Sequence, residues 1–172
     1  ECRGEGRVHA ERKVTVQIPA GIDAGQRIRV PGRGGAGERG ARAGDLYVHV
    51  RVAPHELFER HDDDILYAVD LTMVQAAVGA TLTIPTLDGD EEVTFDPGTQ
   101  PGDIKVLRGK GVPHLHGHGR GDQEVLIRVL VPRELDDNQR RILQEFEEAC
   151  GAEQYGDREE GVLQKLRNWF SN

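Results

Sequence analysis

The chain has 172 residues, a net charge of −8 and 37% hydrophobic residues. This acidic balance excludes a general nucleic-acid binder, which needs a basic surface to displace counterions. No apolar run approaches the roughly 20 residues that cross a bilayer, so no membrane partner is expected. Because the first residue is glutamate rather than methionine, we expect a fragment or a processed chain.

Short strands are predicted along most of the chain, because apolar and polar side chains alternate. The first, Arg12–Pro19, places Val14, Val16 and Ile18 on one face. Further strands are predicted at residues 26–30, 44–52, 64–72, 80–85, 91–95, 103–107 and 123–131. Residues 73–79 predict a brief helix or turn. Glycine and proline at nearly every junction favour a mostly β chain.

The C-terminal part predicts helices. Asp136 and Gln139 have the spacing of a capping box, and Gly151 is a natural stop after the apolar positions that follow them. A second short helix is predicted in the last twelve residues, with one large apolar face. Its members are Val162, Leu163, Leu166, Trp169 and Phe170. An isolated helix of this length is marginal, so we expect this face to dock on another surface.

An internal repeat relates residues 21–52 to residues 98–129. A shift of 77 residues gives ten identities without a gap, six of them glycines. Gly44 and Asp45 fall on Gly121 and Asp122, so a Gly-Asp pair is kept at one turn. The repeat predicts two tandem β-domains of like design, the first of them incomplete.

Two glycine-rich motifs are interpreted as loops. Residues 32–37 match G-x-G-x-x-G, but a dinucleotide site needs a helix directly after that loop, and here a strand follows. His114, His116 and His118 alternate in a second loop without a nearby carboxylate or thiolate in the sequence, so we expect a solvated loop rather than a metal site. Residues 62–64 are interpreted as a solvated strand entry, and residues 120–122 as part of the repeated turn.

No catalytic set is visible in the sequence. Ser171 is the only serine and lies near the end of the chain, which argues against serine-based hydrolysis, and we expect a protein that is not an enzyme. The two cysteines, Cys2 and Cys150, lie at opposite ends of the sequence. No disulfide between them is expected, because nothing else suggests a disulfide-dense secreted domain, and a reducing compartment is favoured. Zinc requires about four ligands, and Cys2 supplies one.

Several stretches together resemble DnaJ, the family of type I J-domain co-chaperones. The start "CRGEG" is similar to the last cysteine and glycines of that family's C-x-x-C-x-G-x-G repeats. The likeness continues through residues 16–34, 43–65, 84–89 and 108–113, and it covers essentially the whole chain. A J-domain, a Gly/Phe-rich linker and a complete zinc region are absent from this sequence.

The resemblance implies two β-sandwich-like client-binding domains and a C-terminal helical dimerisation segment. We expect residues 1–60 to hold the end of the zinc region and the rest of the first β-domain, residues 61–133 the second β-domain, and residues 134–172 the dimerisation segment. The implied function is to bind unfolded or misfolded polypeptides and hold them for a DnaK-type chaperone, in the cytoplasm and as a homodimer. No cofactor is expected in this chain, and zinc is implied for a longer one.

Site residues follow from the same resemblance. Phe58 is the best candidate for client binding, with Val16, Ile18 and Ile28 as weaker ones. Ordinary core packing is the alternative for all four residues, and for the aliphatic three it is equally favoured. The apolar face of residues 162–170 is implied to form the dimer, and Cys2 to bind zinc only where the missing cysteines are present. A non-catalytic scaffold of tandem β-domains remains the alternative function.

Overall fold

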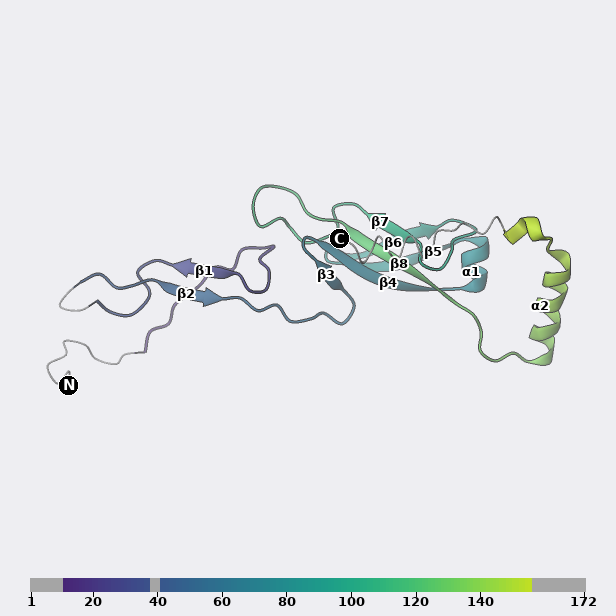
Figure 1. Ribbon diagram of the computed structural model, residues 1–172, viewed down its shortest axis with the longest axis horizontal. Coiled ribbons are helices and arrows are strands. Elements are labelled where there is room, and N and C mark those ends of the chain that lie inside the picture. Colours follow the sequence, from purple (N-terminus) through teal and green to yellow (C-terminus); the bar gives the residue numbers. More distant parts are fainter. Residues whose placement is uncertain (1–10, 38–40, 156–172) are drawn as a thin grey trace. The chain divides into compact units, whose positions relative to one another are not determined.

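A computed structural model describes residues 11–37 and 41–155, and this part of the chain is mostly β (Figure 1). The strands are β1 (Arg27–Val30), β2 (Leu46–His49), β3 (Glu59–His61), β4 (Asp64–Thr72), β5 (Ala80–Thr86), β6 (Gly89–Phe95), β7 (Ile104–Leu107) and β8 (Gln123–Leu130). The helices are α1 (Met73–Val78), α2 (Asp137–Ala149) and a 3₁₀ helix (Ala152–Tyr155). The mostly β class predicted from the sequence is confirmed.

Three sheets contain these strands. β1 and β2 form a two-stranded sheet, β5 and β6 form another, and four strands lie in the order β3-β4-β8-β7. The strand predicted at Arg12–Pro19 was wrong, since this segment has no regular strand structure. Alternation makes a segment suitable for a sheet, but a strand forms only where a neighbour accepts its hydrogen bonds.

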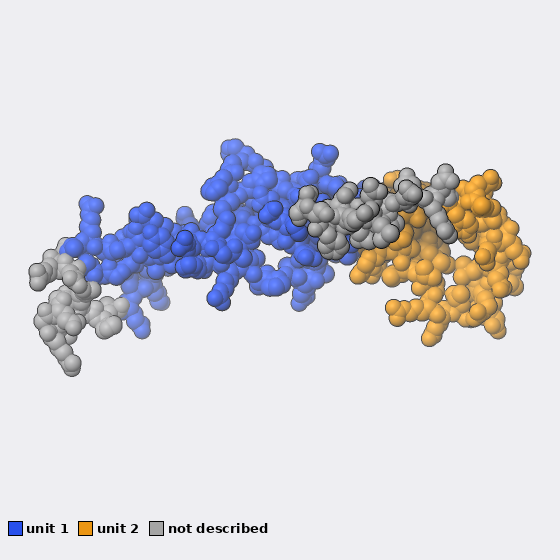
Figure 2. Space-filling model, in the orientation of Figure 1, with its two compact units in different colours: residues 1–68, 83–92, 104–126 blue, residues 69–82, 93–103, 127–172 orange. Residues whose placement is uncertain are grey.

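Two compact units divide the chain (Figure 2). Unit 1, drawn in blue, comprises residues 1–68, 83–92 and 104–126, and unit 2, in orange, comprises residues 69–82, 93–103 and 127–172. Residues of β4, β5, β6 and β8 belong to both units. The domain limits predicted from the sequence, at residues 60 and 133, stay a prediction.

Among the described residues, the buried apolar side chains are aliphatic apart from Phe95. In unit 1 the buried apolar residues are Ile65, Ile84 and Val125, and in unit 2 they are Val69, Leu71, Ala76, Val93, Phe95 and Ile127. Along β8 the buried residues are every second one from Gln123 to Ile127, because successive side chains of a strand point to opposite faces. This strand therefore provides one buried face to the core.

The predicted repeat is present as a repeated hairpin. β1 pairs antiparallel with β2, and Arg27 lies opposite His49. β7 pairs antiparallel with β8, and Ile104 lies opposite Leu126. Both registers match under the shift found in the sequence. We call residues 21–52 the first copy and residues 98–129 the second copy.

The loops inside the two hairpins also match. The amide of Gly34 donates to the carbonyl of Gly44 over 2.8 Å, and the amide of Gly111 donates to that of Gly121 over 2.8 Å. In each loop an aspartate carboxylate accepts a glycine amide, at 2.9 Å for Asp45 with Gly32 and 2.7 Å for Asp122 with Gly109. The aspartate shared by the two copies, Asp45 and Asp122, is therefore a turn-forming residue.

Both α-helices begin at a capping box, and the one at Asp136 and Gln139 was predicted from the sequence. Thr72 and Gln75 form a reciprocal capping box at the start of α1, and Asp136 and Gln139 form another at α2. Each box satisfies backbone N–H groups that have no partner inside the helix. Neither α1 nor α2, nor the described 3₁₀ turn, has the length and apolar character needed to cross a bilayer.

Candidate functional site

Apolar side chains are exposed in the segment that leads from the first copy into β3. Val52 is 46% exposed and Leu57 is 52% exposed, and neither lies in a helix or strand. Phe58 follows directly and is half-buried. Covering an exposed hydrophobic side chain with another apolar group removes it from water and is therefore favourable. The segment therefore offers a place for apolar contacts.

Phe58 contacts two other aromatic rings. The His55 ring stacks on it with centroids 5.0 Å apart and planes 28° apart. Tyr67 on β4 approaches at 5.9 Å with a tilt of 57°. The backbone N–H of Leu57 donates to His55 Nδ1 over 3.1 Å, which fixes the histidine ring beside Phe58. Phe58 is thus oriented by its neighbours while part of its ring stays accessible.

The first copy has open sheet edges. β1 and β2 form a sheet of two strands, so each has a ladder on one side only within the described residues. Unpaired N–H and C=O groups on a strand edge can accept another extended chain. Such pairing uses backbone groups and is therefore largely independent of the partner's sequence.

The aliphatic candidates lie at different places. Ile18 is 67% exposed, and Val16 is half-buried, both in the segment that has no regular strand structure. Ile28 lies on β1, half-buried and opposite Val48. Their assignment to client binding stays a prediction, as does that of Phe58.

The histidine loop has a carboxylate partner that the sequence did not reveal. His114 Nδ1 lies 2.7 Å from Asp63 Oδ2, so the expectation of a solvated loop with no carboxylate nearby was wrong for His114. The two residues are 51 positions apart, and only folding brings them together. Within residues 11–37 and 41–155, no three His, Cys, Asp or Glu side chains converge as a metal site would require.

Arg60 on β3 is the main residue that sequence reasoning missed. Its guanidinium donates to the carbonyls of Gly21 (2.8 Å) and Ile22 (3.0 Å), and its Nε donates to the carbonyl of Asp62 (2.6 Å). No strand was predicted at residues 59–61, and no local pattern in the sequence indicated a partner for Arg60.

Two ion pairs shift pKa values at turns of unit 1. The Gly32 amide and the Arg29 guanidinium hold the pKa of Asp45 below its usual value. Arg120 lies 2.6 Å from Asp88 and lowers the pKa of that carboxyl. Since Arg120 also donates to the carbonyl of Gly111, the Arg-Gly-Asp sequence serves the repeated turn.

The family model described as "DnaJ C terminal domain" matches residues 3–132. This chain belongs to the DnaJ C-terminal domain family. The strand content and the repeated hairpins agree with the resemblance drawn from the sequence motifs.

Three curated relatives, each named "Chaperone protein DnaJ", illustrate how far the likeness extends. The protein of Halothermothrix orenii is 43% identical over 93% of this chain and 42% of its own length. That of Halalkalibacterium halodurans is 47% identical over 87% of this chain and 40% of its own length. That of Haloferax mediterranei is 46% identical over 98% of this chain and 43% of its own length. The chain therefore spans less than half of the DnaJ relatives that it matches.

Other sites implied by the DnaJ resemblance fall outside the described residues. Cys2 lies there, and so does the predicted dimerisation face at Val162, Leu163, Leu166, Trp169 and Phe170. In the described part of unit 2, α2 exposes Ile142 (50%) and Phe146 (58%). Ile142 also lines a cavity of about 280 Å³ together with Met73, Pro132, Glu134, Leu135, Gln139 and Leu143.

Proposed function

We propose that this chain binds unfolded or misfolded polypeptides and holds them for transfer to a DnaK-type chaperone. The observation that carries the proposal is the two-stranded sheet of the first copy, whose outer edges have no strand partner within the described residues. The DnaJ family membership and the exposed apolar segment at Val52–Phe58 support the same function.

Two kinds of contact would act together in client binding. An extended client segment adds to the edge of β1 or β2 through main-chain hydrogen bonds, which any sequence can make. Phe58 then supplies an apolar contact, because its ring is oriented by His55 and Tyr67 and is partly accessible. Recognition by backbone pairing and one aromatic contact suits a protein that must accept many different clients.

Further parts of the proposal concern assembly. The apolar face at residues 162–170 joins two copies of the chain into a homodimer, which gives two linked client sites. Linked sites can raise avidity by roughly 10²–10⁴ when one client spans both. In a longer chain Cys2 contributes one thiolate to a zinc site, a J-domain contacts the DnaK-type partner, and the protein works in the cytoplasm.

The test measures the binding of a labelled apolar peptide by fluorescence anisotropy. Phe58→Ala should weaken binding about tenfold, a loss of about 1.4 kcal/mol. Leu87→Ala is the matched control, since Leu87 is 43% exposed on the β5–β6 turn and should leave the affinity unchanged. Equal affinities of Phe58→Ala and the unsubstituted chain would remove Phe58 from the binding site.

Melting temperature separates binding from packing. Truncating a core phenylalanine costs about 3–5 kcal/mol. Phe95 is 2% exposed and should show this full cost on substitution by alanine, while Phe58→Ala should cost clearly less. A chain that binds no peptide and does not suppress aggregation of a denatured protein would favour the scaffold function instead.

A further inference from the structure

The turn at the start of the first copy lies directly against the loop that follows β7. Gly21 has φ +83°, and a Cβ placed on it would lie 2.0 Å from the carbonyl oxygen of Pro113. No side chain fits in this space. The turn and the loop are therefore in contact through their backbones, within unit 1.

Arg60 binds the same turn through hydrogen bonds to its backbone. Nη2 donates to the Gly21 carbonyl over 2.8 Å and Nη1 donates to the Ile22 carbonyl over 3.0 Å, so one guanidinium binds two successive peptide groups. The Arg60 side chain is 22% exposed, and carboxylate oxygens of Asp23 (3.9 Å) and Asp63 (3.8 Å) lie near its charge. A partly buried cation with these partners is both neutralised and fixed in direction.

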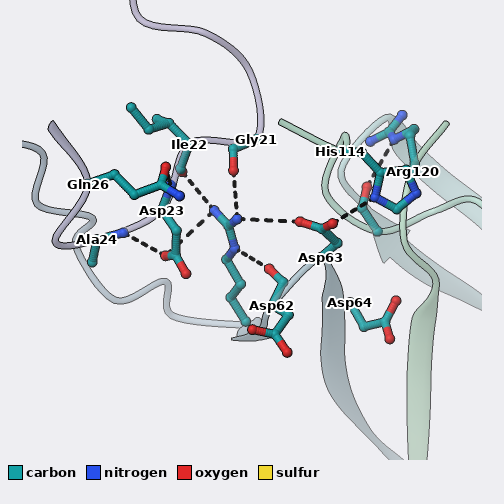
Figure 3. Close-up of polar contacts among 12 residues, drawn as sticks. Gly21, Ile22, Asp23, Ala24, Gln26, Asp62, Asp63, Asp64, His114 and Arg120 are labelled. Atoms are coloured by element: carbon teal, nitrogen blue, oxygen red, sulfur yellow. Dashed lines mark hydrogen bonds and ion pairs between the residues drawn. The ribbon is translucent and has the colours of Figure 1, made fainter. Parts of the chain in front are cut away.

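The contacts then continue to the histidine loop (Figure 3). Asp63 directs Oδ1 toward Arg60 and Oδ2 toward His114 Nδ1, at 3.8 and 2.7 Å. The His114 backbone N–H donates to the carbonyl of Gly119 over 3.2 Å, which anchors the histidine inside its own loop. The turn, the β3–β4 hairpin and the loop thus contact one another in a closed series, in which Arg60 links the turn to the hairpin.

The corresponding turn of the second copy is also an attachment point, but it uses different groups. The amide of Gly98, the counterpart of Gly21, donates to the carbonyls of Ala76 (3.0 Å) and Ala77 (3.2 Å) at the end of α1. In the first copy, a side chain on β3 provides the attachment instead. Arg60 therefore has a role at the first copy that a helix end has at the second.

We propose that Arg60 is a positioning residue that fixes the first copy against the β3–β4 hairpin through its hydrogen bonds to Gly21 and Ile22. We call this attachment the lock. Because Phe58 lies two residues before Arg60, this lock also sets where Phe58 lies relative to the turn of the first copy. Its importance for client binding rests on the function proposed above, whereas the lock itself rests on the contacts of Arg60. Lysine cannot replace the planar fork that reaches two carbonyls at once.

The test is a distance measurement between two spin labels on the full 172-residue chain. Labels are placed at His49 on β2 and Glu92 on β6, both exposed and both in unit 1, after replacing Cys2 and Cys150 with serine. The unsubstituted chain should give one narrow distance peak. This readout requires neither a client nor a partner protein.

Arg60→Gln should lose the narrow peak, and Arg60→Lys should lose it in part. Arg128→Gln is the matched control, because Arg128 pairs with Asp70 at 2.6 Å in unit 2 and touches neither the turn nor the loop among described contacts. It should keep the narrow peak. A narrow peak in Arg60→Gln would overturn the lock.

A glycine pair tests the same lock from the other side, should Arg60→Gln fold poorly. Gly21 and Gly25 have φ +83° and +81°, but only Gly21 faces an obstacle, since nothing lies within 4 Å of a Cβ on Gly25. Gly21→Ala should broaden the distance peak and Gly25→Ala should not. Equal peaks in the two variants would contradict a contact-based lock.

Measuring peptide affinity then tests whether the attachment made by Arg60 matters for client binding. Arg60→Gln should weaken peptide binding about tenfold, because Phe58 is then no longer held at one place relative to the first copy and must be ordered when the peptide binds. A broadened peak with unchanged affinity would overturn the positioning role. If no variant binds peptide, the proposed function fails while the distance result for Arg60 stands by itself.

Discussion

The two copies of the repeat have the same backbone and different surroundings. In both, the strands pair in the same register and an aspartate accepts a glycine amide in the loop. In the second copy β8 has β4 on its other side, and Val125 is completely buried. Its counterpart Val48 is only half-buried, since β2 has no third strand beside it among the described residues. Turn chemistry thus specifies the hairpin, while burial depends on what lies next to it.

The exposed faces of the two hairpins differ as well. In the first copy, Arg27 lies opposite His49 and Arg29 lies opposite Tyr47, which gives a basic and aromatic face. At the equivalent positions of the second copy the residues are Ile104, Leu126, Val106 and Glu124. Since cross-strand neighbours share one face, a single backbone design presents two chemically different surfaces. The comparison shows that surface chemistry can change while register and turns are kept.

The largest expected difference concerns one glycine of the loop. A Cβ on Gly121 would lie 2.1 Å from the carbonyl oxygen of Asp63, whereas a Cβ on its counterpart Gly44 would meet only Gly35 at 3.9 Å. Gly121→Ala should lower the free energy of unfolding by about 3 kcal/mol, at the upper end of overpacking. Gly44→Ala should stay within about 0.5 kcal/mol of the unsubstituted chain.

Urea unfolding of the two glycine variants provides the measurement. The control is Gly25→Ala, which adds strain at positive φ without a steric obstacle. Similar destabilisation at Gly121 and Gly44 would mean that the two loops have the same surroundings, and it would break the comparison.

A smaller difference is expected for the paired valines. Val125→Ala removes two methyl groups from a fully buried position and should cost about 2 kcal/mol, since each buried carbon is worth about 0.8 kcal/mol and a cavity adds to this. Val48→Ala should cost about half as much, because Val48 is only half-buried. Thermal unfolding followed by circular dichroism measures both variants, and an equal cost would indicate that β2 is covered as β8 is.

The smallest effect concerns acid stability of the first copy. Because the pKa of Asp45 is lowered in the folded chain, its ionised form contributes stability above the unfolded pKa of about 3.9, and this stability is lost as the pH falls through the lower folded value. The variant Arg29→Val introduces the residue found at the equivalent position of the second copy, Val106. The pKa of Asp45, followed by NMR, should rise in this variant but stay below its usual value, because the Gly32 amide remains. An unchanged pKa would mean that Arg29 has no influence on the carboxyl.

Local patterns predicted much of this fold. Asp136 with Gln139 gave the start of α2, and the repeated Gly-Asp pairs gave two equivalent turns, because capping and turn formation involve residues close in sequence. The strand at Arg12–Pro19 could not be predicted correctly, since its alternation says nothing about a neighbouring strand. Pairing of strands is a tertiary property.

The candidate site was less accessible from sequence. Phe58 came from a resemblance, and the structure adds the two rings that orient it. The contacts of Arg60 with Gly21 span 39 positions, and those of His114 with Asp63 span 51. No local pattern indicates partners at such separations, because they depend on how the β3–β4 hairpin meets two distant loops.

The identical register of the two hairpins also has a consequence for folding. β1 has a counterpart in β7, so it can pair in the same register with β8 and form a hairpin between copies. Such mispairing closes a loop roughly six times longer than the native one, which costs about 1.6 kcal/mol more in chain entropy. This margin is small, so early in folding a fraction of chains is expected to exchange strands between copies before the buried face of β8 selects its native partners.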